Sequence, residues 1–384
     1  MLRDCCVCNL KVTEVELKTW MLPSMPDLEI GFGICDACGM VIQSTSPSEV
    51  LIKDYYENTA TYINPGNKGK PKKEKIDSLE RYFSIIETVI NFPKSVFQVG
   101  CSDGYTLDRF KKRGSQIVSG VDPSIASNQL AKKLYGIDTI VGTIENISLD
   151  GQKFDLVLLT HVLEHLFNPI HALEICKNFI KLNGLLFIEV PLFENYKKQP
   201  NGVLSLEHLN YFSESTLVET ITRAGYEVIK ISKDFNTLLY PVIAVCCKPK
   251  DGTNFIPSKD ASKNKNTLKR YLDFEKKIWA SIYKNIQSNI GEGSEIYIYG
   301  GGIHTSQLLA NTPLKEYASI LNIVDSSPTK WGKSFGRYTC IRPEEISDSA
   351  NAIVISSKVS EEEIFNFLQS HPCSENLKII KLYS

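Results

Sequence analysis

The sequence predicts an α/β protein built on a doubly wound, mostly parallel β-sheet. β-branched, apolar runs alternate with amphipathic segments from Ser95 to about residue 247. The first run ends in a turn that contains Gly100 and Gly104, and the next run ends at Asp122. This order corresponds to half of a nucleotide-binding α/β unit: a strand, a tight turn, a helix, a second strand and an acidic residue. We expect strands at 96–99, 117–121, 139–141, 155–160, 185–190, 226–231 and 240–246 (the last two antiparallel), and helices at 76–90, 170–180 and 214–224.

The glycine turn departs from the usual dinucleotide-binding pattern. A dinucleotide site usually shows G-x-G-x-x-G, whereas this turn reads G-x-x-x-G with Ser102 in the middle. Glycine lets the backbone approach a ligand closely. Asp122 stands at the carboxyl end of the following strand, where its carboxylate can accept both hydroxyl groups of a ribose.

Composition narrows the class of protein. The chain has 384 residues, of which 42% are hydrophobic and 23% charged, and its formal net charge is −1. This balance favours a globular protein of two or three domains, and it argues against a nucleic-acid or membrane partner. The first residues lack an apolar signal core and no apolar run reaches about 18 residues, so we expect a cytoplasmic protein. The sequence carries no signal for an oligomeric state.

Two cysteine pairs near the start of the chain predict a structural zinc site. Cys5 and Cys8 form one C-x-x-C pair, and Cys35 and Cys38 form the other. Two such turns can bring four thiolates together as a tetrahedral Zn²⁺ site without an open position. Redox C-x-x-C motifs begin a helix after a strand, which neither pair does. Cys6 lies between the first two and is expected to point away from them.

The chain divides on composition into a small module, two α/β regions and a linker. A polar stretch rich in lysine and containing proline and glycine separates the α/β regions. We expect a zinc module at 1–48, a nucleoside-binding domain at 49–247, a linker at 248–266 and a second α/β domain at 267–384.

A second motif follows the strand expected at 155–160. His161, Glu164 and His165 are spaced to lie near one face at the start of a helix, beside the glycine turn. H-x-x-E-H also matches the inverted zinc-protease motif. Its place at a strand-to-helix turn, followed at once by Asn168-Pro169, argues against a protease.

Taken together, VFQVGCSDG, GVDPS, FDLVLLTHVLEHLFNP and EHLNYFSESTLVETITRAGYEV resemble the class I S-adenosylmethionine (SAM) methyltransferases. The four cysteines and the C-terminal Rossmann-like unit make the chain similar to the three-domain sugar C-methyltransferases, which act on nucleotide-linked sugars. The resemblance implies a small-molecule acceptor, a nucleotide-linked sugar used for a surface glycan or a secondary metabolite. By position it implies SAM contacts at Gly100, Ser102, Gly104, Asp122, Ile144 and His161.

The sequence departs from that family at two positions. Gln98 stands where an acidic residue is usual, two positions before the first glycine, so Asp103 becomes the alternative carboxylate for the ammonium group of SAM. Ser205 stands where the sugar C-methyltransferases carry a tyrosine linked to proton abstraction. Methylation of carbon and methylation of oxygen therefore both stay open.

The resemblance places His208 on the acceptor side, and an imidazole suits the role of base because it titrates near neutrality. Glu207 precedes it and would orient the ring. His208 is equally readable as a loop-packing residue. His165 either holds the acceptor or packs at the start of its helix.

Gly300, Gly302 and Asp325 form a second, incomplete dinucleotide pattern. Three interpretations of this pattern stay open: a structural turn without a cofactor, a site that binds the diphosphate of the substrate, and an NAD site. Two alternatives to small-molecule methylation stay open: an RNA-modifying methyltransferase that binds nucleic acid through the cysteine pairs, and a nucleotide-sugar oxidoreductase that uses this C-terminal unit.

Overall fold

The computed structural model divides the chain into two compact units, and each unit is considered by itself. The first comprises Met1–Val15, Phe32–Pro200 and Glu207–Leu268, and the second Glu16–Gly31, Asn201–Leu206 and Lys269–Ser384. The structure describes residues 3–20, 28–45, 71, 73–200, 202–237, 239–252, 255–347, 349–372 and 377–383.

A seven-stranded sheet organises the first unit, in the order β10-β11-β8-β7-β4-β5-β6. All neighbouring pairs are parallel except the two that β11 makes with β8 and β10. The alternation seen in the sequence therefore predicts the sheet correctly, including the antiparallel last pair. The strands are β4 (Ser95–Val99), β5 (Ile117–Asp122), β6 (Ile140–Val141), β7 (Phe154–Thr160), β8 (Ile180–Pro191), β10 (Tyr226–Asp234) and β11 (Val242–Pro249).

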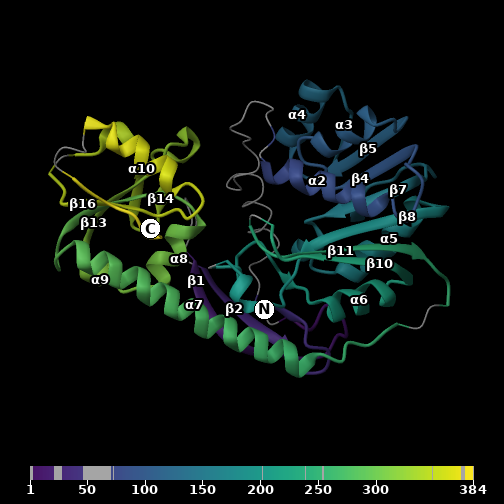
Figure 1. Ribbon diagram of the computed structural model, residues 1–384, viewed down its shortest axis with the longest axis horizontal. Helices are drawn as coiled ribbons and strands as arrows, with labels where there is room; N and C mark the ends of the chain where they lie inside the picture. Colours follow the sequence, from purple (N-terminus) through teal and green to yellow (C-terminus); the bar gives the residue numbers. More distant parts are fainter. Residues whose placement is uncertain are drawn as a thin grey trace. The chain divides into compact units, whose positions relative to one another are not determined.

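Helices cover both faces of this sheet. Figure 1 shows α2 (Lys73–Ile86), α3 (Tyr105–Lys112) and α4 (Ile125–Tyr135) on one face, with α5 (Pro169–Cys176) and α6 (Glu214–Arg223) on the other. Each face has its own buried apolar cluster, because every strand between two helical layers is apolar on both sides. The sheet is thus the doubly wound arrangement that the sequence predicts.

Strand register fixes where the predicted site residues lie. β4 pairs in parallel with β5 and with β7, so the carboxyl ends of all three strands meet at one edge. The glycine turn follows β4, Asp122 ends β5, and the H-x-x-E-H motif follows β7. Ligands of open α/β sheets bind at this edge.

The cysteine pairs flank a four-stranded sheet of order β1-β2-β3-β9. Its strands are β1 (Val12–Trp20), β2 (Leu28–Cys35), β3 (Val41–Thr45) and β9 (Asn210–Tyr211). Residues 16–31 belong to the second compact unit, so residues 1–48 do not form the single module expected from the cysteine spacing. Cysteine spacing predicts only the turns that carry the thiols, and the neighbouring strands β1 and β2 extend past those turns. The expected boundary at residues 48 and 49 lies outside the described residues.

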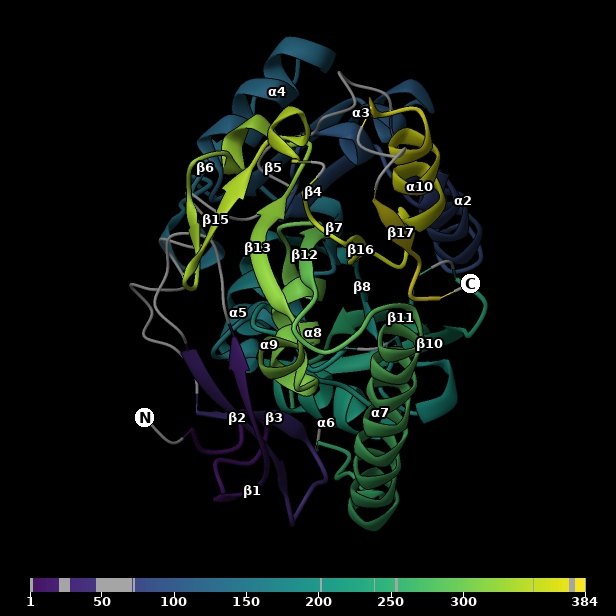
Figure 2. The same ribbon diagram turned by 90° about the vertical axis from the view of Figure 1, so that its left-hand side faces the viewer.

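The second unit contains a six-stranded sheet of order β14-β15-β13-β12-β16-β17. Figure 2 shows β12 and β13 side by side. Every neighbouring pair of this sheet is parallel except β14 with β15, which is antiparallel. The strands are β12 (Glu295–Tyr299), β13 (Ser319–Val324), β14 (Ser334–Phe335), β15 (Tyr338–Ile341), β16 (Ala352–Ile355) and β17 (Lys378–Ile380); the helices are α8 (Ile303–Asn311), α9 (Leu314–Tyr317) and α10 (Glu361–Gln369).

The long helix α7 (Ala261–Asn289) begins inside the segment expected to be a linker, so the expectation of a linker through residue 266 is wrong at its end. Residues 261–266 contain neither proline nor glycine, and nothing in them stops a helix. Asn264 anchors this first part of α7, because its side-chain amide donates to the carbonyl of Gly39 and to Oγ of Ser213. No helix among the described residues combines the length and the apolar character needed to cross a membrane.

Candidate active site and cysteine cluster

The glycine turn is held in place by Asp122. Gly100, Ser102 and Gly104 all have positive φ, at 67°, 49° and 77°. Oδ2 of Asp122 accepts a hydrogen bond from the amide of Ser102 at 2.8 Å, and Oδ1 accepts from the amide of Ser124 at 2.9 Å. The left-handed backbone of Ser102 is strained for a residue other than glycine. The carboxylate of Asp122 therefore stabilises the turn and lies directly beside it.

The carboxylate of Asp122 retains capacity for a ligand. Burial raises its pKa, and within the described residues no lysine or arginine forms an ion pair with it. A carboxylate offers about four lone-pair sites, and the two amides occupy two of them. The remaining sites suit the two hydroxyl groups of a ribose.

Asp103, the carboxylate expected to meet the ammonium group of SAM, and Gln98, which replaces the usual acid, differ in their surroundings. Asp103 forms an ion pair with Lys75 at 2.6 Å and accepts from the amide of Tyr105, so it already has a cationic partner. Gln98 is 4% exposed, and its Nε2 lies 3.4 Å from Oγ1 of Thr160. Within the described part of the chain its Oε1 is buried without a hydrogen-bond partner. A ligand's ammonium group would satisfy that oxygen.

Ile144 lies where the adenine contact is expected, at the sheet edge beyond β6. It begins the short 3-10 helix Ile144–Asn146, and its side chain is 2% exposed within the apolar core. β6 pairs with the end of β5, with Val141 opposite Asp122. The buried side chain of Ile144 thus holds its backbone close to the strand end that carries Asp122.

His161 lies between two buried carboxylates directly after β7. Its Nδ1 is 3.3 Å from Oε1 of Glu164, and its Nε2 is 3.3 Å from Oε1 of Glu189. The backbone of His161 is left-handed, with φ of 55°. Burial opposes protonation of His161, but Tyr240 and the two carboxylates outweigh it and raise its pKa well above the ordinary value. A strained residue between two carboxylates is typical of a functional site.

Glu189 was not predicted from the sequence. It is 0% exposed on β8, where it accepts two hydrogen bonds of 2.8 Å from Nη2 of Arg81 and one from the hydroxyl of Tyr82. The one signal was a glutamate inside the apolar run LLFIEVP, because a buried charge needs a partner. Arg81 and Tyr82, on α2, gave no signal.

His165 and His208 face each other next to Glu164. Their ring centroids are 4.9 Å apart, and Nε2 of His165 is 3.8 Å from Oε1 of Glu164. Nδ1 of His165 donates to the backbone carbonyl of Glu207 at 2.8 Å, so Glu207 orients His165 through its main chain. Burial and the neighbouring His165 lower the pKa of His208 to about 3. His208 is therefore a neutral imidazole at pH 7.

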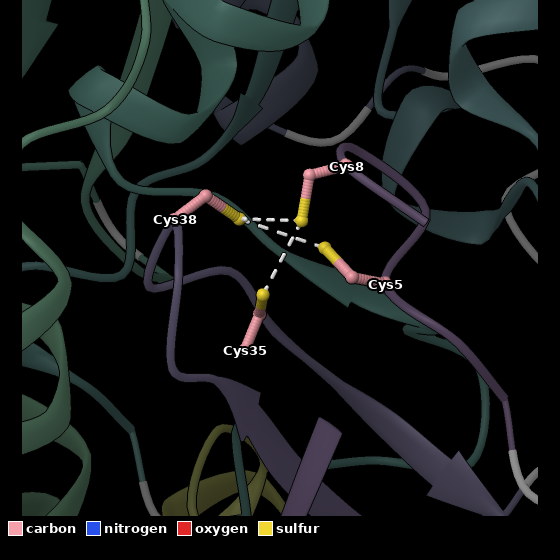
Figure 3. Close-up of side chains that lie close together, drawn as sticks. All are labelled: Cys5, Cys8, Cys35 and Cys38. Atoms are coloured by element: carbon pink, nitrogen blue, oxygen red, sulfur yellow. Dashed lines mark hydrogen bonds between the residues drawn. The ribbon is translucent and has the colours of Figure 1, made fainter. Parts of the chain in front are cut away.

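The structure brings the four predicted cysteines together (Figure 3). The Sγ atoms are 3.5 Å apart for Cys5 and Cys38, 3.4 Å for Cys8 and Cys35, and 3.8 Å for Cys8 and Cys38. Four sulfurs at about 2.3 Å from one Zn²⁺ would be about 3.8 Å apart, so this cluster fits the ion. Cys6 points elsewhere, as expected, and its Sγ lies 3.2 Å from Oδ1 of Asn210.

The second glycine turn is closed by protein groups. Oδ2 of Asp325 accepts from the amide of Gly301 and pairs with Nζ of Lys330, both at 2.8 Å. Oδ1 accepts from the amide of Ser327, and the hydroxyl of Thr305 donates to the carbonyl of Gly300. These contacts favour the scaffold interpretation over a cofactor site.

Comparison with known proteins identifies one region of the chain. Residues 72–231 match the family model described as a methyltransferase domain. The ubiquinone biosynthesis O-methyltransferase of Haemophilus ducreyi is 26% identical over 189 residues, which cover 46% of this chain and 75% of that protein. The protein of the same name from Coxiella burnetii is 30% identical over 121 residues, which cover 30% of this chain and 51% of that protein.

A further relative and a solved structure also match part of the chain. The tRNA U34 carboxymethyltransferase of Campylobacter jejuni is 25% identical over 224 residues, covering 53% of this chain and 74% of that protein. Magnesium protoporphyrin IX methyltransferase from Synechocystis PCC 6803, solved with bound SAH, matches with 15% identity and a TM-score of 0.43. That match covers 53% of this chain and all of the other.

Proposed function

Since the chain carries a SAM-dependent methyltransferase domain, we propose that it transfers a methyl group from SAM to a small acceptor, a nucleotide-linked sugar. The observation that supports SAM binding is the turn at Gly100, held by Asp122, whose carboxylate keeps acceptor capacity for the hydroxyl groups of a ribose. SAM supplies an electrophilic methyl group on a sulfonium, and the protein must align it with the acceptor's nucleophile. Gly100, Ser102, Gly104 and Ile144 would line the nucleoside, with Gln98 near its ammonium group.

On the acceptor side we assign His165 and His208, whose rings face each other next to Glu164, whereas His161 stays among the SAM contacts. His208 is neutral, which is the form that can accept a hydrogen bond or a charge from the acceptor. Glu207 acts by holding the ring of His165. The nucleotide-sugar assignment is supported by the resemblance of the whole chain to sugar C-methyltransferases. The names of the relatives point instead to a quinone and a tRNA acceptor.

A screen with labelled SAM separates these acceptors. The full chain would be incubated with nucleotide-linked sugars, with catechol-type quinone precursors and with total tRNA, and label in each fraction would be counted. We expect label in a nucleotide sugar, and NMR of the product then tells methylation of carbon from methylation of oxygen. Label in tRNA or in the quinone precursor, with none in any sugar, would overturn the sugar assignment.

We propose further that Cys5, Cys8, Cys35 and Cys38 hold one structural Zn²⁺. The sulfur spacing supports it, and four thiolates leave no position for a substrate. We expect about one zinc per chain by mass spectrometry, and loss of that zinc with a lower unfolding temperature in Cys38→Ser. Cys6→Ser is the matched control and should keep its zinc. Equal zinc content in both variants would contradict the site.

A further inference from the structure

Glu164, His165 and His208 form a second cluster of metal-ligating groups, separate from the cysteines. Their ligand atoms all lie within 4.8 Å of one another. Glu164 and His165 belong to the 3-10 helix Leu163–His165, which follows β7, and His208 lies two residues before β9. Chain segments about forty residues apart in sequence therefore meet at one point.

The orientation of His165 leaves a ligand nitrogen aimed into this cluster. The carbonyl of Glu207 can only accept, so Nδ1 of His165 carries the hydrogen of that bond. The other ring nitrogen, Nε2, lies 3.8 Å from Oε1 of Glu164. Histidine ligands of metals usually donate their other nitrogen to a carbonyl or carboxylate in this way.

The carboxylate of Glu164 is the second observation that points to a ligand. Its side chain is 1% exposed, and within the part of the chain that the structure describes neither oxygen has a hydrogen-bond partner. His161 lies 3.3 Å from Oε1, but it is shared with Glu189. Buried carboxylates are ordinarily hydrogen-bonded, paired or bound to a metal. Glu189, with Arg81 and Tyr82, has such partners, whereas Glu164 has the capacity for one more.

We propose that Glu164, His165 and His208 bind one divalent first-row transition-metal ion. Two imidazoles and one carboxylate leave coordination positions open for other ligands, and they suit Mn²⁺, Fe²⁺ or Zn²⁺. Three ligand atoms at about 2.1 Å from one ion lie at most about 4.2 Å apart, and the pair formed by Nε2 of His165 and Oε1 of Glu164 is already within that distance, at 3.8 Å.

The open positions would take an oxygen of the methyl acceptor. β7 neighbours β4, and a Cβ at Gly100 would lie 2.5 Å from Cγ2 of Val162, so the motif and the glycine turn touch. The cation would thus hold a hydroxyl or carbonyl oxygen beside the methyl donor, and it would make the bound hydroxyl, or the C–H group next to the bound carbonyl, more acidic. This role in catalysis rests on the proposed methyl transfer, whereas binding of the ion does not.

Mn²⁺ alone tests the site, because it prefers oxygen and imidazole ligands and leaves a four-thiolate site to zinc. The full chain would be dialysed against a mild chelator, checked for retained zinc, and titrated with Mn²⁺ while the EPR signal of free Mn²⁺ is followed. We expect about one Mn²⁺ bound per chain, with at least tenfold weaker binding in His165→Asn and in His208→Asn. His171→Asn is the control, since this exposed histidine also has a glutamate nearby, Glu174 at 3.6 Å.

Two results would overturn the proposal: no loss of free Mn²⁺ signal with the wild-type chain, or equal binding in His208→Asn and His171→Asn. To show that the variants fold, thermal unfolding of the wild type and of each variant is also measured with and without Mn²⁺. We expect a cooperative transition in every variant and a Mn²⁺-dependent rise of the melting temperature in the wild type and His171→Asn. A rise of the same size in His208→Asn also counts against the site. SAM is absent from these experiments. A chain that does not bind Mn²⁺ can therefore still transfer a methyl group, and a chain that transfers no methyl group can still bind Mn²⁺.

Discussion

The molecule contains two glycine turns built by the same device. In the first unit Asp122 accepts from the amide of Ser102 in the turn and from the amide two residues further along its own chain. In the second unit Asp325 does the same with Gly301 and Ser327. In both, an acid at the end of the second strand pins the turn that follows the first strand.

The turns differ in what else reaches the carboxylate. Lys330 forms an ion pair with Asp325 at 2.8 Å, and Thr305 closes the turn from the helix side. Asp122 forms no ion pair with a described lysine or arginine, and Lys75, whose charge lowers the pKa of Asp122, pairs with Asp103 instead. In both units, therefore, the acid first of all stabilises the backbone of the glycine turn. The turn becomes a ligand site only where the acid keeps capacity for a ligand.

The largest expected difference between the turns is in SAM affinity. Asp122→Asn removes the charge that would accept the ribose hydroxyls, and hydrogen bonds to a charged group contribute about 1.5–3 kcal/mol. We expect calorimetry to show SAM binding weakened roughly ten- to a hundredfold. Asp325→Asn is the matched control and should bind SAM as the wild type does. Equal weakening in both variants would break the comparison.

The second expected difference concerns stability. Lys330→Met leaves the carboxylate of Asp325, which is 11% exposed, without its cation. An unpaired charge so deeply buried costs about 1–3 kcal/mol, because the remaining amides compensate only part of it. Urea unfolding should show this loss, while SAM affinity stays unchanged. Lys132→Met removes an exposed pair with Asp138 and should leave the unfolding free energy unaltered; a loss as large as that of Lys330→Met would mean that burial is not the cause.

The smallest expected effect comes from the backbone of the turns. Ser102→Gly relieves the left-handed strain at φ of 49° and should stabilise the protein by up to about 1 kcal/mol. Gly301, the position that corresponds to it through the Asp325 contact, has no such strain. A Cβ there would lie 3.2 Å from Sγ of Cys340, so Gly301→Ala should be mildly destabilising. Thermal unfolding checks both signs, and a destabilised Ser102→Gly would show that the serine hydroxyl contributes more than the strain costs.

Much of the fold could be predicted because local pattern and tertiary structure agree. The runs around β4, β5 and β7 are apolar on both faces, as a sheet covered by helices requires, and their order fixes the edge that carries Asp122 and His161. The start of α7 could not be predicted, because its first turns are polar and resemble a loop. Their helical state depends on contacts such as that of Asn264 with Gly39, which lie far away in sequence.

The candidate site shows the same limit. The site residues on the turns that follow β4, β5 and β7 could be predicted from the sequence, because the strand order brings those turns to one edge of the sheet. Arg81 could not, because a basic residue on an amphipathic helix ordinarily faces water, and only the fold reveals the buried Glu189 beneath it. Lys330 was missed for a similar reason: its partner is five residues away across a bend that no motif marks.

A crystal structure of the full chain with S-adenosylhomocysteine tests the central claim most directly. We predict the nucleoside along the turn from Gly100 to Gly104, with both ribose hydroxyls within hydrogen-bond distance of the Asp122 carboxylate. A ligand bound elsewhere, or side chains filling the space beside Asp122, would contradict the account.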